Sequence, residues 1–216
     1  FPTRRSSDLN LTATGSLNYS GSLNLESARG NIDLGNNNSL AGTVSLKAAG
    51  NITLDNLQAL SLGDLFAQNA TLSSGTSIKG FVMFSVAGLT TLNAGGEINL
   101  ANAGNDINQI NVARATKLDL FDSNGITTVG LNVTDDVHLR SSGGIILSTS
   151  CTPDCNNTHG INTKNLKVKS DVGVTVAKSI VAADTINIES QGLVINDSIT
   201  SKQFTLNALN GKLVLN

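Results

Sequence analysis

The chain has 216 residues, of which 39% are hydrophobic, only 14% are charged and 3% are aromatic, and its formal net charge is −2. This balance excludes a disordered chain, which combines low hydrophobicity with high charge, and argues against a nucleic-acid binder, which needs basic charge and aromatic rings. No apolar run reaches the roughly 20 residues that span a bilayer, so the chain is not expected to cross a membrane.

The polar residues are mostly uncharged. Asn, Ser and Thr occur 27, 23 and 21 times, and Gly adds 21 more residues. Leu, Ile, Val and Ala are spaced regularly between them. Asn, Gly and Ser favour turns, while β-branched residues favour strands, so the composition predicts short strands joined by many turns.

Residues 1–9, FPTRRSSDL, differ from the rest of the chain in Pro2, in the adjacent Arg4 and Arg5, and in lacking aliphatic alternation. The segment resembles the conceptual translation of a widely used sequencing adapter, so we expect it to be non-native. The alternative is a native, disordered N-terminal segment. The rest of the chain, 10–216, begins without Met and stops within a repeat, so we expect it to be a fragment of a longer protein.

One pattern recurs from Leu17 to Leu215: two aliphatic residues flanking a polar one, a short polar stretch, Gly, and another aliphatic–x–aliphatic triplet. An example is Leu23-Asn24-Leu25 followed by Gly30-Asn31-Ile32-Asp33-Leu34. The pattern is strict after Gly30, Gly50, Gly96, Gly143 and Gly211, and looser after Gly75, Gly125, Gly173 and Gly192. The intervals between these glycines are 20, 25, 21, 29, 18, 30, 19 and 19 residues, so the period is 19–21 residues and three intervals carry apparent insertions.

Such an interval is too short for a strand–helix–strand crossover, and it suits three short strands and three turns in each coil of a solenoid. Alternation in each strand sends aliphatic side chains inward and polar side chains outward. The outward set is expected to be Asn24, Asp33, Ser45, Thr53, Asn99, Asp119, His138, Lys167, Asn187 and Thr205.

The sequence therefore predicts an all-β fold, a right-handed, single-stranded parallel β-helix of about nine coils. Asn residues stacked in successive coils are expected to form a ladder of side-chain amides. A β-sandwich is disfavoured because hairpin signals at regular spacing of about 8–12 residues are missing.

The most apolar run, Phe81-Val82-Met83-Phe84-Ser85-Val86, would make both faces of its strand hydrophobic. We expect it to pack under a neighbouring insertion. The alternative is an exposed patch for a partner.

The densest charged segment is Asp135-Asp136-Val137-His138-Leu139-Arg140. Asp136, His138 and Arg140 alternate outward on one strand face, where a lyase or glycosidase of the β-helix type could place its acid–base groups. A solvated outer face with ion pairs between strands gives the same pattern without catalysis, and it is the favoured interpretation.

Cys151 and Cys155 lie in the longest interval, in an insertion at about 148–160 that is expected to project from the rod. An isolated pair in a chain without other cysteines favours a local disulfide, with free thiols as the alternative. With His159 the pair matches no usual zinc spacing, so no metal or other cofactor is expected. A projecting loop is where a partner contact would lie, and Pro153, Asp154 and His159 are its candidate residues.

The repeat L-x-L-x-x-x-x-G-x-I-x-L, rich in Asn, Gly, Ser and Thr, resembles the filamentous-haemagglutinin-type exoproteins of two-partner secretion over Leu17 to Leu215. The resemblance implies a secreted adhesin at the bacterial outer cell surface, an outer-membrane secretion partner for the full-length protein, and a receptor or glycan on a host or neighbouring cell. The uniform repeats and the lack of a convergent polar site favour a structural and adhesive shaft segment without catalysis. A carbohydrate-active β-helix enzyme and the stalk of a contact-dependent toxin-delivery exoprotein are the alternatives.

Overall fold

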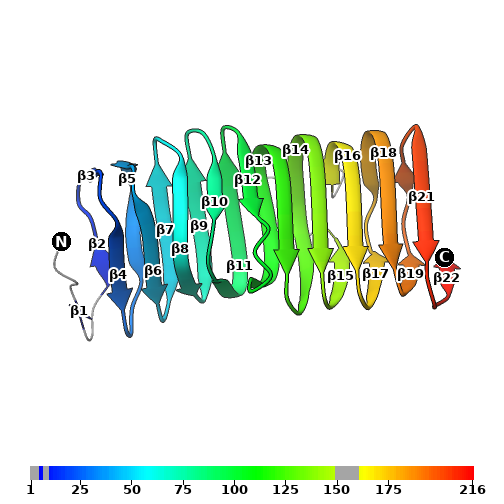
Figure 1. Ribbon diagram of the computed structural model, residues 1–216, viewed down its shortest axis with the longest axis horizontal. Coiled ribbons are helices and arrows are strands. Elements are labelled where there is room, and N and C mark those ends of the chain that lie inside the picture. Colours follow the sequence, from blue (N-terminus) through cyan, green and yellow to red (C-terminus); the bar gives the residue numbers. More distant parts are fainter. Residues whose placement is uncertain (1–4, 7–9, 149–160) are drawn as a thin grey trace.

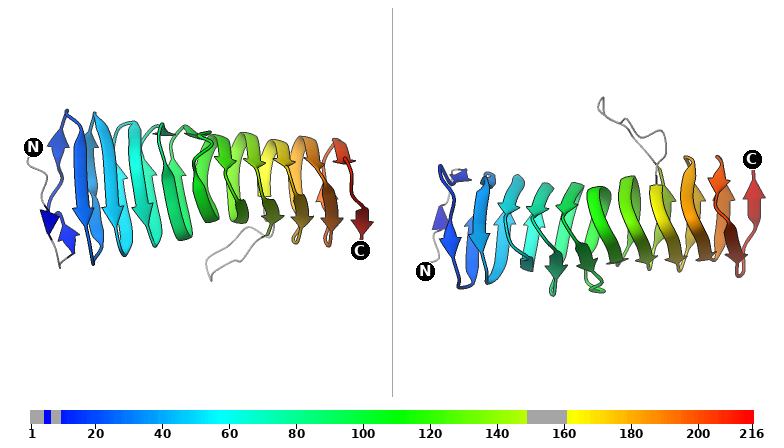
Figure 2. Two further views of the ribbon diagram at one scale, coloured as in Figure 1. Left: turned by 60° about the horizontal axis from the view of Figure 1, so that its bottom comes forward. Right: turned by 90° about the horizontal axis from the view of Figure 1, so that it is seen from above.

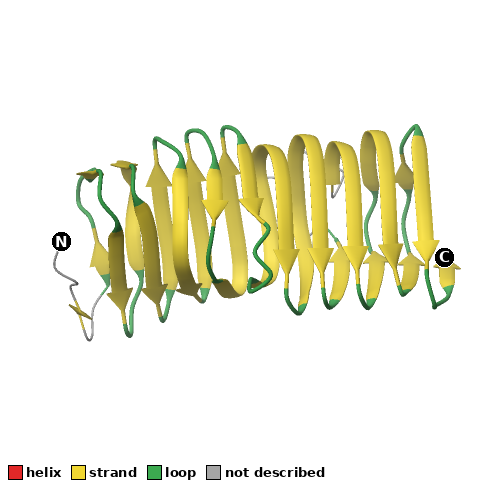
Figure 3. Cartoon of the chain, viewed as in Figure 1, coloured by secondary structure: helices red, strands yellow, loops and turns green. Residues whose placement is uncertain are grey.

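The computed structural model describes residues 5–6, 10–148 and 161–216, and this part of the chain consists of strands and turns without any helix (Figure 3). The strands stack into a parallel β-solenoid of about ten turns, close to the nine that the repeat count predicts. Figure 1 shows the resulting rod, with the two termini at opposite ends.

The strands of the N-terminal half are β1 (Arg5–Ser6), β2 (Leu11–Thr12), β3 (Asn18–Tyr19), β4 (Leu23–Ser27), β5 (Ile32–Leu40), β6 (Thr43–Ala48), β7 (Asn51–Asn56), β8 (Leu60–Ala67), β9 (Asn69–Ser74), β10 (Ile78–Gly80), β11 (Phe84–Ala94) and β12 (Glu97–Leu100). Those of the C-terminal half are β13 (Asp106–Asp122), β14 (Gly125–Ser141), β15 (Gly144–Leu147), β16 (Ile161–Ser170), β17 (Gly173–Val176), β18 (Ile180–Ser190), β19 (Gly192–Ile195), β20 (Ile199–Thr200), β21 (Gln203–Ala208) and β22 (Leu213–Leu215).

Three parallel sheets wrap around the core, and we name them by the strands that define them. Sheet A contains β5, β7, β9, the second half of β11, the middle of β13 and β14, the starts of β16 and β18, and β20. Sheet B contains β10, β12, the ends of β13, β14, β16 and β18, and β21. Sheet C contains the first residues of β14 together with β15, β17, β19 and β22. The longest strands, β13 and β14, have 17 residues each and bend around the corners of the rod (Figure 2).

The core is a column of aliphatic side chains, as the alternation predicts. In sheet B the inward residues Ile78, Ile98, Leu118 and Val137 lie in register in four successive coils and are almost completely buried. None of the ten residues predicted to point outward is buried. The thin interior takes few rings: Phe84 is the one aromatic side chain in the described core.

The strand register shows that the intervals between glycines are not the lengths of the coils. Gly50 precedes a strand of sheet A and Gly96 one of sheet B, whereas Gly125 opens a strand of sheet C, so the nine glycines do not mark one corner. Ile52 pairs with Ala70 and Ile98 with Leu118, at spacings of 18 and 20 residues, so two of the three expected insertions do not exist.

Among the described residues, one coil is longer than the others. Leu131 pairs with Ile161, 30 residues away, whereas Ile161 pairs with Ile180, 19 residues away. Apart from Ser148, the predicted insertion at 148–160 lies outside the described residues. Of the segment 1–9, the structure describes the backbone of Arg5 and Ser6, which pairs with Glu26 and Ser27 of β4.

The expected Asn ladder runs along the corner that leads into sheet A. The Asn31 side chain accepts the backbone N–H of Asn51 at 2.7 Å, and the Asn69 amide donates to Asn51 Oδ1 at 2.9 Å. Leu89 N–H in turn donates to Asn69 Oδ1 at 2.8 Å. The side chains thus mostly hold the backbone of the next coil and bond to one another at only one of these steps.

Candidate functional site

Asp136, His138 and Arg140 point outward from β14, because Val137 and Leu139 between them fill the core. The strand places neighbouring members of this set about 7 Å apart along one face. This confirms the predicted alternation. Whether the three groups form a site depends on the contacts that each of them makes.

Asp136 is held by its neighbours in adjacent coils. Its carboxylate accepts a hydrogen bond from Asn165 Nδ2 at 2.9 Å and lies 3.3 Å from Lys117 Nζ. The hydrogen bond from Asn165, followed by the contact with Lys117, keeps the pKa of Asp136 below its usual range. A general acid at neutral pH needs the opposite shift, so Asp136 is suited to remain an ionised structural carboxylate.

Arg140 and His138 form no hydrogen bond or ion pair with Asp136. Arg140 Nη2 contacts Asp119 Oδ1 at 3.0 Å, and its guanidinium lies 5.5 Å from the ring centre of Phe121. The His138 backbone is in register with Asp119 and Lys167, and its ring forms no hydrogen bond or ion pair among the described residues. The three side chains therefore face the same way without converging on one point.

The polar groups of sheet B instead form a line along the rod. Lys79 Nζ contacts Glu97 Oε1 at 2.7 Å, Lys117 contacts Asp136, Asn165 contacts Asp136, and Thr185 Oγ1 donates to Asn165 Oδ1 at 2.8 Å. Glu97 of the first pair and Lys117 of the second pair lie opposite each other in the backbone register, which connects the two pairs. We call this series the axial line (Lys79, Glu97, Lys117, Asp136, Asn165 and Thr185); charge alternates along its first four members.

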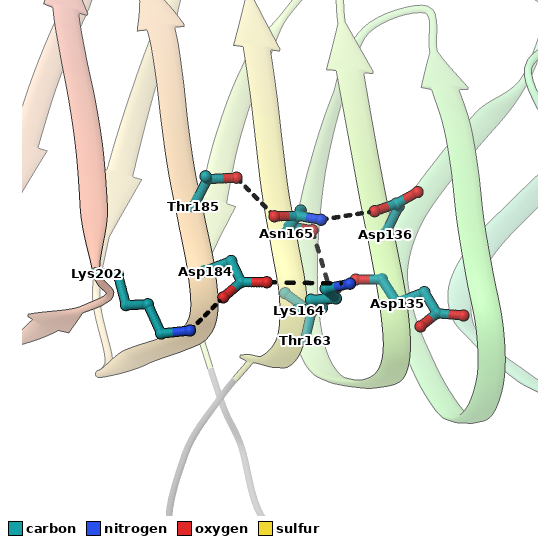
Figure 4. A network of polar contacts seen from close by, with 8 residues as sticks. All are labelled: Asp135, Asp136, Thr163, Lys164, Asn165, Asp184, Thr185 and Lys202. Atoms are coloured by element: carbon teal, nitrogen blue, oxygen red, sulfur yellow. Dashed lines mark hydrogen bonds and ion pairs between the residues drawn. The ribbon is translucent and has the colours of Figure 1, made fainter.

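An open groove lies beside the axial line, where β14, β16 and β18 turn from sheet A toward sheet B. Figure 4 shows the polar side chains of this region, among them Thr163, Lys164 and Asp184. Its volume is about 430 Å³, and its lining is Asn132, Val133, Thr134, Asn162, Thr163, Lys164, Ala183 and Asp184. The register shifts between Asn132 and Asp136 and again between Thr163 and Asn165, so the coils separate here.

The charges of this groove are largely neutralised. Asp184 Oδ1 receives Lys202 Nζ at 2.7 Å, while Lys164 Nζ lies 4.0 Å from the other oxygen. The hydrogen bond from Lys202 lowers the pKa of Asp184. Thr163 Oγ1 donates to the backbone oxygen of Asp135 at 2.8 Å. These contacts fasten one coil to the next, and the Asp184 carboxylate is not poised for proton transfer.

A second, apolar groove of about 360 Å³ lies on sheet C, over Gly144, Gly173, Gly192, Ile146, Val172, Thr175 and Val194. Ile146 and Val172 are 44% and 60% exposed. The groove contains no charged side chain, so it offers packing surface without groups for catalysis.

The expected packing of the apolar run at Phe81 is wrong in part. Phe84 and Val86 enter the core, but Phe81, Val82 and Met83 form the corner between β10 and β11 and are 62%, 48% and 43% exposed. The strand ends at Gly80, so alternation does not bury these three residues.

Cys151, Pro153, Asp154, Cys155 and His159 lie outside the described residues. Within the described ranges, no group of His, Cys, Asp and Glu side chains is arranged to hold a metal ion. The same ranges contain no helix of the length and hydrophobicity that crossing a membrane requires.

Buried polar residues at the corners were missed by sequence reasoning. Asn56 donates to the carbonyl of Leu40 at 3.1 Å, and Ser170 Oγ donates to that of Gly143 at 2.6 Å. Asp122 accepts backbone N–H groups from Ile107, Asn124 and Gly125. Each lies two residues beyond a buried aliphatic residue, so continuing the strand alternation by one step would have found them.

Residues 6–47 and 49–113 match a family described as repeats of unknown function (DUF5649). No curated protein and no solved structure matches the chain. The match supports the repetitive character of the coils up to β13.

Proposed function

We propose that this chain is a structural and adhesive shaft segment of a large secreted bacterial surface exoprotein, and that it is not an enzyme. The axial line carries this proposal. The polar groups that a catalytic site would need are used to join successive coils, through contacts at Glu97, Asp136 and Asn165. The resemblance of the repeats to filamentous-haemagglutinin-type exoproteins supports secretion and a place at the cell surface.

Adhesion is tested with beads coated with the chain and mixed with bacterial or animal cells. We expect the beads to be retained above the level of albumin-coated beads, and soluble chain to compete with them. Retention equal to that of albumin would refute an adhesive role for this segment.

The proposed contact with a receptor or glycan lies in the segment that contains Pro153, Asp154 and His159, with a disulfide between Cys151 and Cys155. Mass spectrometry with and without reductant tests the disulfide, since reduction adds two hydrogens. Replacing both Cys by Ser is the matched variant in the bead assay. Unchanged retention with a triple alanine variant at 153, 154 and 159 would place the contact elsewhere.

The enzyme alternative is tested with variants that the fold already accommodates. Asp136→Asn and His138→Asn introduce the residue that stands one coil away at Asn165 or two coils away at Asn187 in the same outward rows. We expect no cleavage of acidic or neutral polysaccharides by the wild-type chain. Cleavage by the wild type that either variant abolishes would overturn the non-enzymatic proposal.

A further inference from the structure

The chain contains two Asn-Gly sequences, and both lie at a corner between sheets B and C. Asn124-Gly125 joins β13 to β14, and Asn210-Gly211 lies between β21 and β22. Asn followed by Gly is prone to spontaneous imide formation, because Gly has no side chain to keep its amide nitrogen away from the Asn side chain. The two corners hold this sequence very differently.

At the first corner two carboxylates accept hydrogen bonds from the groups that would react, the Gly125 N–H and the Asn124 side chain. Gly125 N–H donates to Asp122 Oδ2 at 2.7 Å, and Asn124 N–H donates to the same oxygen at 3.1 Å. The Asn124 side chain donates to Asp106 Oδ1 at 2.9 Å. Attack requires the Gly125 nitrogen to lose its proton, and the Asp122 carboxylate both retains that proton and opposes a negative nitrogen beside it.

At the second corner no carboxylate restrains the corresponding groups. Gly211 N–H has no hydrogen-bond partner among the described residues, and Asn210 is exposed. Its side-chain amide has one partner, Gln191 Oε1 at 2.8 Å, which is a neutral group. Asn210 and Gly211 are therefore free of the carboxylate contacts that restrain Asn124 and Gly125.

We propose that Asn210 is a site of spontaneous covalent modification and that Asn124 is protected from it. A base removes the Gly211 amide proton, and the nitrogen attacks Asn210 Cγ. The new C–N bond closes a succinimide while the Cγ–Nδ2 bond breaks and ammonia leaves. Water then opens the ring at either carbonyl, which yields aspartate or isoaspartate and requires no other reactant.

The modified residue would change the corner that leads into β22. Isoaspartate carries the main chain through Cβ and so lengthens it by one atom, and either product adds a negative charge. Leu213 and Val214 now pair in register with Leu193 and Val194 of β19. A longer corner would misalign this short pairing, so modification at Asn210 would loosen β22 from sheet C.

The test compares both sites in one sample. The purified chain is incubated in mildly alkaline buffer, folded or unfolded in urea, and peptides are mapped by mass spectrometry with enzymatic labelling of isoaspartate. In urea we expect both sites to react at similar rates. In the folded chain Asn124 should slow by about tenfold or more, because its reaction requires opening a turn held by charge-assisted hydrogen bonds, while Asn210 stays near its unfolded rate. Equal rates at both sites in the folded chain, or equal protection, would overturn the proposal.

Variants of the two carboxylates test whether their hydrogen bonds, rather than the overall stability of the fold, protect Asn124. Asp122→Ala should speed the reaction of Asn124 and leave that of Asn210 unchanged. Should that variant fail to fold, Asp106→Ala at an exposed position frees the Asn124 side chain and should give a smaller acceleration. Asn210→Gln, which keeps the amide, should abolish the isoaspartate signal from its peptide. A signal that persists there, or no acceleration at Asn124 in a folded variant, would contradict the assignment.

Discussion

Single buried polar side chains hold the corners of this rod. A corner frees backbone groups from the ladder, and an unpaired buried group costs about 1–3 kcal/mol. Ser170 shows how one hydroxyl meets this need: it donates its single hydrogen to the carbonyl of Gly143, which is closer than that of Gly173, and accepts the N–H groups of Val172 and Gly173. Where all the partners are donors, as at Asp122, a carboxylate replaces the hydroxyl.

Thr90 breaks this rule, and it provides a stability test. Its hydroxyl is buried and is without a partner in the described part of the chain, and its backbone is in register with Ala70 and Ile110. We expect Thr90→Val to raise the free energy of unfolding by about 1 kcal/mol, because it removes an unpaired polar group while keeping the shape. Urea denaturation followed by circular dichroism measures the change.

Thr128 is the matched control. It is equally buried, but its Oγ1 donates to Ser148 O at 3.2 Å and accepts Ser148 N–H at 3.1 Å. Thr128→Val should lower stability by about 1 kcal/mol. Changes of the same sign in both variants would show that the hydrogen bonds do not account for the difference.

The carboxylates outside the core set the acid response. Lys79 holds the pKa of Glu97 below its usual range, and Asn165 and Lys202 do the same for Asp136 and Asp184. A lowered folded-state pKa stabilises the protein above the unfolded pKa, and that contribution is lost as the pH falls through the folded value. Burial raises the pKa of Asp122, which acts in the opposite direction over its own range.

We therefore expect the urea midpoint to fall as the pH drops below about 4. The loss should be modest, because Glu97, Asp136 and Asp184 are solvent-accessible, and salt should reduce it. Asp136→Asn should show a smaller loss than wild type. A midpoint that rises through this range would mean that Asp122 dominates the acid response.

At the scale of the strand, alternation predicts which side chains point inward, and it does so along sheets A and B. It fails where a strand ends, as at Phe81 to Met83, because a corner has no alternation. Gly spacing was a poorer guide, since all three corners use glycine. Coil-to-coil contacts such as Lys117 to Asp136 depend on register, which the sequence of one strand does not contain.

Glycines at similar corners differ in what they require. A Cβ on Gly143 would overlap the carbonyl oxygen of Asn124, whereas a Cβ on Gly192 would meet no atom within 4 Å. Gly143→Ala should therefore destabilise by about 1–3 kcal/mol through overpacking. Gly192→Ala should be neutral or stabilise by about 0.5 kcal/mol, since it restricts the unfolded chain.

Denaturation midpoints of the two variants check this pair. Equal losses would mean that both glycines are needed for their backbone conformation, which their φ angles do not indicate, because Gly125 is the one described glycine with a positive φ. A tolerated Gly143→Ala would show that the coils can separate at this corner.

At the scale of the whole molecule, each coil is stabilised by the next, so stability and association depend on the ends of the rod. Strands β20, β21 and β22 pair on one side only in this 216-residue chain. Phe204 and Leu215, which continue the core column, are 64% and 68% exposed. Unpaired strand edges beside an open apolar core are templates for another strand.

We therefore expect the isolated chain to associate end to end as its concentration rises. Sedimentation velocity should show species of increasing length rather than a single closed dimer, because the two ends of the rod are different surfaces and their contact does not close on itself. Phe204→Asp with Leu215→Asp should shift the chain toward monomer, whereas Ile146→Asp on the side of the rod should leave association unchanged. A strictly monomeric wild-type chain at high concentration would contradict this expectation, and loss of association in the Ile146 variant would move the contact from the end of the rod to the apolar groove on sheet C.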